Sequence, residues 1–371
     1  MKFLIVTHTY HQLKNGRYAA YMPYVREMDL WNNYFDKITV VAPLEKNNEA
    51  SLLQTYSKDI EFKRIPIFQI NGLRHLPKAV ISSVYVFFLL INEMRKADHI
   101  HIRCPGNIGL IGSFAQIFFP RKTKTAKYAG NWDWNSQQPW SYRLQQRMLR
   151  STVLTHNMQV LVYGVWPDKN RNILPFFTAS YKEEEIREVQ KSDFKKGIKL
   201  CFIGTLDENK SPILSLKVME LLKSRGNKVS LTFCGEGPLR RKVEEESRRM
   251  QLEDSVHLLG NVPAEEVKRV LIDSHFLVFI SKSEGWPKAV AESMFWGCVP
   301  MTSNVSCVPH MVGEEEERGV LLEQNPHEIA LQVMKLVNSP CKYADISKNA
   351  MKWSRNFTLE KFATEIGRLI H

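Results

Sequence analysis

The chain has 371 residues, 44% of them apolar and 24% charged, which excludes wholly disordered, collagen-like and low-complexity proteins and predicts two domains, or three. Six scattered cysteines without a C-x-x-C pair exclude a disulfide framework and a cysteine zinc site, and favour a reducing compartment. The net charge of +12 lies entirely in residues 1–178, which hold 23 Lys and Arg against 11 Asp and Glu, whereas residues 179–371 hold 28 of each.

The first half alternates short apolar runs with helical or irregular segments. Its expected strands are Lys2–Thr7, Ile38–Ala42, Ile60–Ile65, Ile100–Arg103, Thr125–Ala129 and Val160–Tyr163. Helical apolar spacing marks Ala19–Trp31 and Leu76–Lys96. The most apolar stretch, Ala79–Ile91, is too short to span a membrane and is more typical of a buried helix than of a membrane-dipping one. Strands separated by helices predict a parallel sheet.

The charged run Lys182–Lys196 interrupts this pattern, and we place a linker at about residues 175–197. The second half is more regular. Its expected strands are Ile198–Ile203, Val229–Cys234, Val256–Leu259, Phe276–Ile280, Val299–Thr302 and Val320–Leu322. Its expected helices are Pro212–Ser224, Leu239–Met250, Ala264–Ile272, Pro287–Trp296, and three near 326–338, 342–355 and 359–370. We therefore predict two doubly wound parallel α/β domains, with a cleft between them.

Several catalytic motifs are absent from the sequence. It has no G-x-G-x-x-G after a strand, no G-x-x-x-x-G-K-[ST] and no G-x-S-x-G, which argues against dinucleotide oxidoreductases, P-loop NTPases and α/β-hydrolases. The pairs His8/His11 and His99/His101 lack nearby carboxylates, so they are interpreted as ordinary histidines and not as metal ligands.

The most informative segment is Ser281–Ser293. Glu284 follows an expected strand, and Pro287 begins a helix that contains Glu292. The free backbone amides at the start of such a helix favour a phosphate. For this pair alone, a helix cap with a surface glutamate is the simpler interpretation.

Three other strands of this half also end in glycine-bearing loops. Gly204 and Thr205 follow the first strand, and Lys210 stands just before the next helix, where an ammonium can reach a diphosphate. Gly235-Glu236-Gly237-Pro238 and Leu259-Gly260-Asn261-Val262 follow the next two strands, and glycines there permit close approach of a ligand. Because the strands are parallel, all four loops belong to one edge of the sheet.

This set of motifs resembles the retaining glycosyltransferases of family 4, which have the GT-B fold of two Rossmann-like domains. Glu284 and Glu292 are similar to the family's E-x7-E motif, with Gly285-Trp286-Pro287 after the first glutamate. Gly204–Lys210 resembles its G-R-L-x-x-x-K-G loop, and the two glycine turns resemble its G-x-G-P turn and nucleobase loop. The resemblance implies an acceptor-side domain at 1–178, a donor domain at 179–356, and a last helix, 357–371, that packs back on the first domain.

The resemblance also implies roles for individual residues. Glu284 contacts the transferring sugar, Glu292 holds the ribose and Lys210 binds the diphosphate. Thr205 stands where the family usually has Arg, so Arg17 or Arg103 of the first domain is a candidate for the missing charge. The candidate catalytic residues are Glu284, Lys210, Arg103 and His101. The candidate donor-binding residues are Gly16, Arg17, Gly204, Thr205, Gly235, Glu236, Gly237, Asn261, Val262, Gly285, Trp286, Pro287 and Glu292.

The first domain matches the family less closely. Gly16 stands at the position of its glycine loop, and Asp98–Pro105 resembles its D-x-x-H-x-H segment, with Arg103 in place of the second histidine. His101 is either a site residue or a strand residue that faces the core. The aromatic segment Gly130–Trp134 either stacks on an acceptor sugar or belongs to the core.

The implied function is a retaining, metal-independent transfer of a sugar from a nucleotide-sugar to a glycan or lipid-linked acceptor, in cell-surface polysaccharide synthesis. No cofactor is expected beyond the co-substrate, for which UDP- or GDP-sugars are favoured over ADP-sugars. The alternatives are a weak or inactive nucleotide- or polyanion-binding relative and a sugar-nucleotide epimerase of the same fold.

The partners expected from the charge are anionic. The basic first half suits a lipid-diphosphate acceptor and an anionic membrane surface, with Leu76–Lys96 as an apolar helix flanked by Arg74, Lys78, Arg95 and Lys96. A solubilising surface without a partner is the alternative. No nucleic acid is expected. Met1–Thr7 turns polar too early for a secretory signal, so the expected location is the cytoplasm, including the inner face of a membrane.

Overall fold

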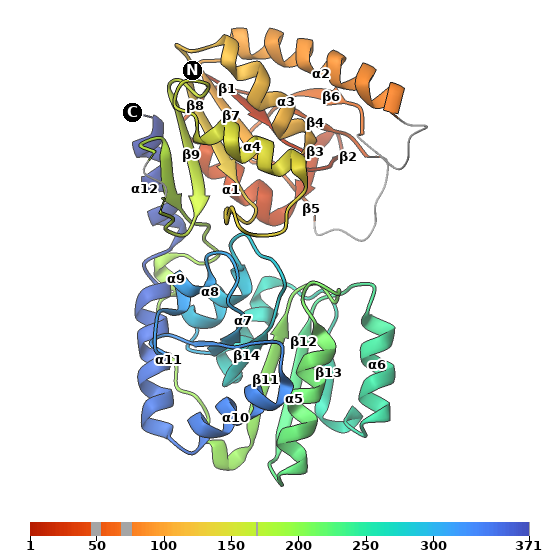
Figure 1. Ribbon diagram of the computed structural model, residues 1–371, viewed down its shortest axis with the longest axis vertical. Helices are drawn as coiled ribbons and strands as arrows, with labels where there is room; N and C mark the ends of the chain where they lie inside the picture. Colours follow the sequence, from red (N-terminus) through yellow and green to blue (C-terminus); the bar gives the residue numbers. More distant parts are fainter. Residues whose placement is uncertain (46–52, 68–75, 168–169, 371) are drawn as a thin grey trace. The chain divides into compact units, whose positions relative to one another are not determined.

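The computed structural model describes residues 1–45, 53–67, 76–167 and 170–370 (Figure 1). The chain divides into two compact units. The first consists of residues 1–177 together with the residues from Phe362 onward, and the second of Thr178–Lys361. Arg74 lies outside the described residues.

The first unit contains a seven-stranded parallel sheet. In spatial order its strands are β10 (Ile173–Phe176), β9 (Met158–Tyr163), β8 (Thr123–Tyr128), β7 (His99–Cys104), β1 (Lys2–Val6), β4 (Lys37–Pro43) and β6 (Glu61–Ile65). Its helices are α1 (Met22–Asn32), α2 (Leu76–Lys96), α3 (Asn107–Ala115), η2 (Gln116–Phe118), α4 (Trp140–Arg150) and the larger part of α12 (Leu359–Ile370). The strand order reverses between β1 and β7, which is the Rossmann arrangement.

Alternate residues of the central strands face two different layers. Leu4, Ile100 and Ile102 pack with the inner side of α2, whose Val86 and Leu90 are fully buried. On the opposite face, aromatic rings of β1, β7, α1 and the turn after α1 pack together, for example Phe3 on Phe35 with centroids 4.3 Å apart. Burying each such side chain contributes about 1.5–3 kcal/mol, so both layers stabilise the sheet.

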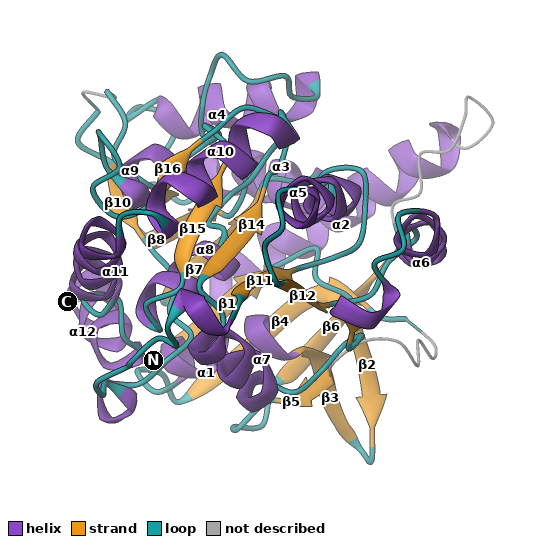
Figure 2. Ribbon diagram, turned by 90° about the horizontal axis from the view of Figure 1, so that it is seen from below, coloured by secondary structure: helices purple, strands orange, loops and turns teal. Residues whose placement is uncertain are grey.

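A small antiparallel sheet, which was not expected, is formed by two strands before α1 and one after it. It contains β2 (His11–Lys14), β3 (Arg17–Tyr21) and β5 (Leu53–Thr55). Asn15 and Gly16 form the two-residue turn between β2 and β3, at φ +50° and +77°. Figure 2 shows this hairpin with its turn directed away from the seven-stranded sheet. The expected helix Ala19–Trp31 is therefore wrong in its first three residues, because pairing with β2 and β5 overrides their apolar spacing.

The second unit contains a six-stranded parallel sheet. In spatial order its strands are β13 (Val256–Leu258), β12 (Val229–Cys234), β11 (Ile198–Ile203), β14 (Phe276–Phe279), β15 (Val299–Thr302) and β16 (Val320–Leu321). Its α-helices are α5 (Pro212–Ser224), α6 (Arg240–Arg249), α7 (Ala264–Asp273), α8 (Lys288–Phe295), α9 (Val308–Val312), α10 (Pro326–Val337) and α11 (Pro340–Ser354). Its short 3-10 helices are η3 (Glu183–Glu185), η4 (Phe194–Lys196) and η5 (Glu253–Ser255). Here the order reverses between β11 and β14.

The expected class of two doubly wound parallel α/β units is confirmed. The sequence reasoning missed α3, α4 and β10 in the first unit. β10 is an edge strand that contains Pro175, and its last two residues were expected to begin the linker. A proline is tolerated there because an edge strand does not need every backbone donor.

Candidate active site

The second unit has its candidate site where its strand order reverses. Loops that follow β11 and β14, residues 204–211 and 280–287, meet at this point. In open parallel sheets, the carboxyl ends of the two strands at such a reversal border the crevice that binds ligands. Lys210 belongs to the first loop and Glu284 to the second.

Lys210 and Glu284 form an ion pair between Nζ and Oε1. Their side chains are only 17% and 8% exposed. The Lys210 ammonium also lies 4.5 Å from the ring centroid of Phe279, the last residue of β14, and its backbone N–H donates to Asp207 Oδ1 at 2.9 Å. A charged pair that is mostly removed from water is costly to break, because the remaining charge loses its partner.

Asn209 joins the two loops. Its side chain donates to the Ser283 carbonyl at 3.0 Å and accepts from the Ser283 N–H at 3.1 Å, while its own carbonyl accepts from the Lys282 N–H at 2.9 Å. The sequence reasoning missed Asn209. Its signal was an asparagine next to the candidate lysine, a residue type that bonds to nearby backbone in turns.

The glycines of the neighbouring loops allow backbone to approach backbone. At Gly235 φ is +143°, and an added Cβ would collide with the Gly204 carbonyl oxygen. At Gly237 it would lie 2.5 Å from the Leu206 carbonyl oxygen, and Leu206 N–H donates to the Glu236 carbonyl at 3.0 Å. These glycines, which were expected to admit a ligand, are therefore required by loop-to-loop packing as well.

The loop that follows β13 contacts the Gly235 loop through Gly260, whose carbonyl accepts from the Gly235 N–H at 2.8 Å. The Glu236 carboxylate is paired with Arg240, which also donates to Glu244 at 2.9 Å. Asn261 is exposed and Val262 half-buried. The structure thus brings the loops with Gly204, Gly235 and Asn261 together along one edge of the sheet.

The residues after Glu284 pack against α11, the segment that follows it, and Cys307. Trp286 is buried, with its ring centroid 6.3 Å from that of Trp353 and 5.6 Å from that of Phe357. The Gly285 carbonyl accepts from Cys307 Sγ at 3.0 Å. Pro287 is the residue before α8, so its ring restricts the backbone where the helix begins.

Glu292 lies inside α8 and is tied to the start of the second unit. Its Oε1 accepts from Ser180 Oγ at 2.5 Å. Burial, and next the negative charge of Glu292, raise the pKa of the neighbouring Tyr181. A carboxylate that already accepts hydroxyl hydrogen bonds is suited to accept them from a ribose.

The candidate residues of the first unit have partners within that unit. Gly16 is the hairpin turn residue described above, and the exposed guanidinium of Arg17 lies 3.8 Å from Asp59. Arg103 Nη1 lies 3.8 Å from Glu27 Oε1, which also accepts from the buried Lys127 at 2.7 Å. The structure thus places both arginines beside carboxylates.

His101 is fully buried in the aromatic layer of the first unit. Its Nδ1 lies 2.9 Å from Thr125 Oγ1, and its ring centroid lies 4.8 Å from that of Trp31. Burial lowers the pKa of His101 to about 3. The structure therefore places this histidine in the core of the first unit.

His8, which was interpreted from the sequence as an ordinary histidine, is a further candidate site residue of the first unit. It follows β1 at the point where the first sheet reverses its strand order, and an added Cβ on Gly106, after β7, would lie 3.3 Å from its Nδ1. Burial, and next the positive charge of Arg103, lower the pKa of His8 to about 4. The available signal was its position as the residue directly after the first expected strand.

Within the described part of the chain, no three His, Cys, Asp or Glu side chains gather closely enough to hold a metal ion. Over the same residues, no helix is both long and apolar enough to cross a membrane.

Two sheets in Rossmann order, with glycine-bearing loops and a lysine–glutamate pair at the reversal point of the second, are the arrangement of the GT-B fold. The family described as "Glycosyl transferases group 1" matches residues 182–353, and over these residues the chain is similar to that family.

Solved structures share the whole fold. HepE of Anabaena, in complex with UDP and glucose, superimposes with a TM-score of 0.69 at 13% identity, and the match covers 99% of this chain and 98% of that one. At this identity the likeness shows the fold alone, and the predicted GT-B fold is confirmed.

Curated relatives match over shorter regions. A phosphatidylinositol N-acetylglucosaminyltransferase protein of Arabidopsis thaliana is 27% identical over 110 residues, 30% of this chain and 24% of that protein. A Campylobacter jejuni alpha-1,4-N-acetyl-D-galactosaminyltransferase, named for a PP-undecaprenol-linked glycan, is 25% identical over 181 residues, 48% and 49% of the two chains. The chain thus spans between a quarter and a half of the length of these relatives.

Proposed function

We propose that this protein is a retaining, metal-independent glycosyltransferase that moves a sugar from a nucleotide-sugar to a glycan or lipid-linked acceptor. The observation that supports this most directly is the Lys210–Glu284 ion pair at the reversal point of the second sheet. It joins the two loops whose motifs suit a diphosphate and a sugar. Electrostatic stabilisation of developing charge is the main contribution that such a site makes.

The proposed roles follow from the chemistry of each group. The Lys210 ammonium stabilises negative charge that develops on the leaving diphosphate, and the Glu284 carboxylate accepts hydrogen bonds from sugar hydroxyls. In the free protein these two groups neutralise each other. When the donor binds, Lys210 exchanges Glu284 for the diphosphate, and Glu284 exchanges Lys210 for sugar hydroxyls. Glu292 holds the ribose, and the first backbone amides of α8 face a phosphate. Thr205 adds no charge of its own.

The exposed apolar side of α2 is an observation in favour of an acceptor at a membrane. This segment was expected to be a buried helix, yet Ile81 and Phe88 on its outer side are 71% and 64% exposed. Val84, Phe87, Phe114 and Phe118 line an apolar groove of about 500 Å³ between this side and the neighbouring α3 and η2. An apolar helix face with basic residues at its end, here Arg95 and Lys96, is suited to reversible binding at an anionic membrane surface.

The names of the relatives agree with a lipid acceptor. One is named for phosphatidylinositol and the other for PP-undecaprenol. On this basis we propose that the acceptor is presented at the inner face of a membrane, where the first unit binds the surface. We expect the donor to be a UDP-sugar or a GDP-sugar.

The test is a screen for sugar transfer and hydrolysis with UDP-, GDP- and ADP-sugars, without added metal. We expect Glu284→Gln to nearly abolish transfer with nucleotide affinity retained, and Glu292→Ala to raise KM. Glu208→Gln, which changes an exposed glutamate of the Lys210 loop, is the matched control and should retain activity. Nucleotide binding without turnover of any donor would instead support an inactive, nucleotide-binding relative.

A further inference from the structure

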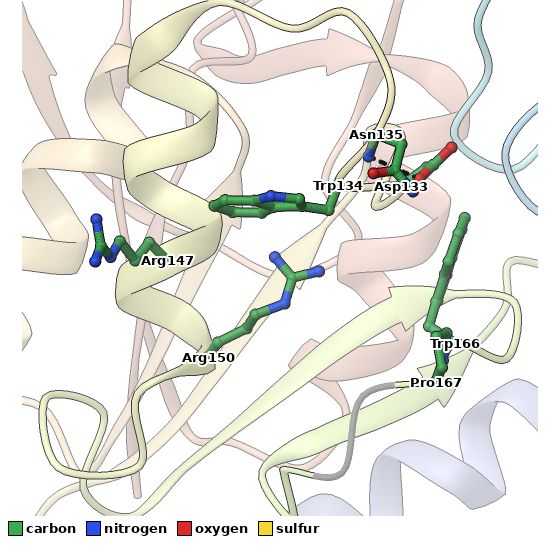
Figure 3. Close-up of a pocket in the computed structure, with 7 residues that line it drawn as sticks. All are labelled: Asp133, Trp134, Asn135, Arg147, Arg150, Trp166 and Pro167. Carbon is green, nitrogen blue, oxygen red and sulfur yellow. Dashed lines mark hydrogen bonds between the residues drawn. The ribbon is translucent and has the colours of Figure 1, made fainter.

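The first unit has its own polar pocket at the carboxyl ends of β8 and β9. Loops that follow these two strands form two of its sides and α4 forms a third (Figure 3). Its volume is about 330 Å³, and its lining includes Asp133, Trp134, Asn135, Arg147, Arg150 and Trp166. None of these residues was assigned to the donor site. The pocket lies on the carboxyl edge of the sheet, which is the edge where open parallel sheets bind ligands, but beside the reversal between β1 and β7 and not at it.

A stack of aromatic rings fixes the position of one arginine in this pocket. The Arg150 guanidinium carbon lies 4.4 Å from the ring centroid of Trp132 and 5.1 Å from that of Trp134. Trp132 is fully buried, whereas Trp134 is 46% exposed. Because a guanidinium stacks on indole faces and still directs its N–H groups outward in its own plane, Arg150 is prepared to bind an oxyanion.

The other lining groups give the pocket two chemically different ends. Arg147 precedes Arg150 by three residues on α4 and also lines the pocket, but Figure 3 shows its side chain directed away from the Arg150 guanidinium, so it lies at the rim. Asp133 is the acidic residue, and its Oδ1 accepts from the Asn135 N–H at 2.9 Å. Figure 3 shows Arg147 and Asp133 on opposite sides of the Trp134 indole. One end therefore favours an anion, and the other favours hydroxyl groups.

Trp166 forms the wall opposite α4 in Figure 3. Its indole N–H donates to the Tyr163 carbonyl at 2.6 Å, which restrains the ring. Two restrained indoles that border a small pocket supply apolar faces against which the C–H groups of a pyranose pack, at little cost in side-chain entropy.

We propose that this pocket binds a sugar ring with one anionic substituent, a carboxylate or a phosphate. The anion lies at Arg150, with Arg147 at the rim adding positive charge, the ring lies against Trp134 and Trp166, and a hydroxyl donates to Asp133. The inference rests on the proposed function only in making this sugar part of the acceptor. The binding itself requires neither the donor nor turnover.

The experiment is calorimetric titration of the full chain, without a nucleotide-sugar, with four probes. These are methyl glucuronide, glucose 1-phosphate, neutral methyl glucoside and inorganic phosphate. At least one of the two anionic sugars should bind about tenfold or more tightly than both methyl glucoside and inorganic phosphate, since a hydrogen bond to a charged group is worth about a factor of ten or more. The stronger of the two tells whether the anion is a carboxylate or a phosphate.

Variants connect the binding to the pocket. Arg147→Ala and Trp134→Ala change exposed side chains, and each should weaken binding of the anionic sugar about tenfold. Trp134→Phe should restore part of the loss. Arg121→Ala removes an exposed arginine that precedes β8, beyond the opposite end of that strand, and should have no effect.

Three results would overturn the proposal. One is equal affinity for the neutral and the anionic sugars. Another is affinity for inorganic phosphate that matches the anionic sugars, which would leave an adventitious ion only. The third is equal weakening by Arg121→Ala and Arg147→Ala, which would indicate a general response to surface charge. Because no donor is present, absence of transferase activity would affect the proposed function alone.

Discussion

The Lys210–Glu284 pair should contribute to the stability of the free protein as well as to transfer. At an effective dielectric constant of ~20, a pair at contact distance attracts by about 4 kcal/mol, and desolvation of two largely buried groups reduces the net value to about 1–3 kcal/mol. Lys210→Met keeps an unbranched side chain beside Phe279 but removes the charge. We therefore expect Lys210→Met and Glu284→Gln each to destabilise the protein, and the double variant to lose less than their sum.

The assay is a double-mutant cycle measured by urea unfolding, combined with transfer rates. The coupling free energy should be about 1–3 kcal/mol, and Lys210→Met should lower the transfer rate by about 10²–10³. The double variant should regain stability but not activity. The exposed pair Lys199 and Asp273, 2.6 Å apart in the same unit, is the control and should couple by less than about 1 kcal/mol. Additive stability losses at Lys210 and Glu284, or turnover in the double variant, would refute this reasoning.

Three further predictions concern packing, pH and the membrane. Gly235→Ala should destabilise the second unit by about 2 kcal/mol or more, because the added Cβ collides with neighbouring backbone and the positive φ is strained. Gly226→Ala, at φ +82° in open space, is the control and should cost about 1 kcal/mol. Equal unfolding free energies of the two variants would contradict this prediction. Burial holds the pKa of His101 at about 3, below its unfolded value. The contribution of His101 to the free energy of unfolding should therefore be fully present above pH ~6.5 and fall by about 1.4 kcal/mol per pH unit toward pH 3. An unfolding free energy that does not change between pH 7 and 4 would contradict this prediction. In sedimentation assays the protein should bind anionic vesicles at low salt and dissociate where the Debye length falls below ~5 Å. Ile81→Asp or Phe88→Asp, which change exposed residues of α2, should weaken this binding about tenfold. Equal binding to neutral vesicles would exclude the proposed surface.

The elements of the second unit could be predicted well from the sequence, because their signals are local. Strands such as Ile198–Ile203 and Val229–Cys234 are short apolar runs between polar or glycine residues, and the structure has both with these bounds. The helix Pro212–Ser224 begins at a proline, where the missing N–H costs nothing. The glutamate spacing, the lysine and the glycine turns were also visible as residue types in a pattern.

The first unit was harder to predict, because two local signals conflicted. Asn15-Gly16 is the strongest short signal for a hairpin, yet the helical spacing of the residues after it was followed instead. His101 shows another difficulty. Alternation along a strand shows that neighbouring residues face opposite sides of the sheet. It does not show that Trp31 and Phe3 cover the side on which His101 lies.

The sequence by itself determined which chemical groups the candidate sites contain and that they follow strands. Only the tertiary structure decided which strands are neighbours. β11 lies beside β14, although β12 and β13 intervene in the chain, and this order places Lys210 against Glu284. Likewise, only the packing of α2 showed that Ile81 and Phe88 face outward. The reason is the same in both cases: hydrophobic periodicity depends on residues a few positions apart, whereas sheet order and burial depend on contacts between residues far apart in the chain.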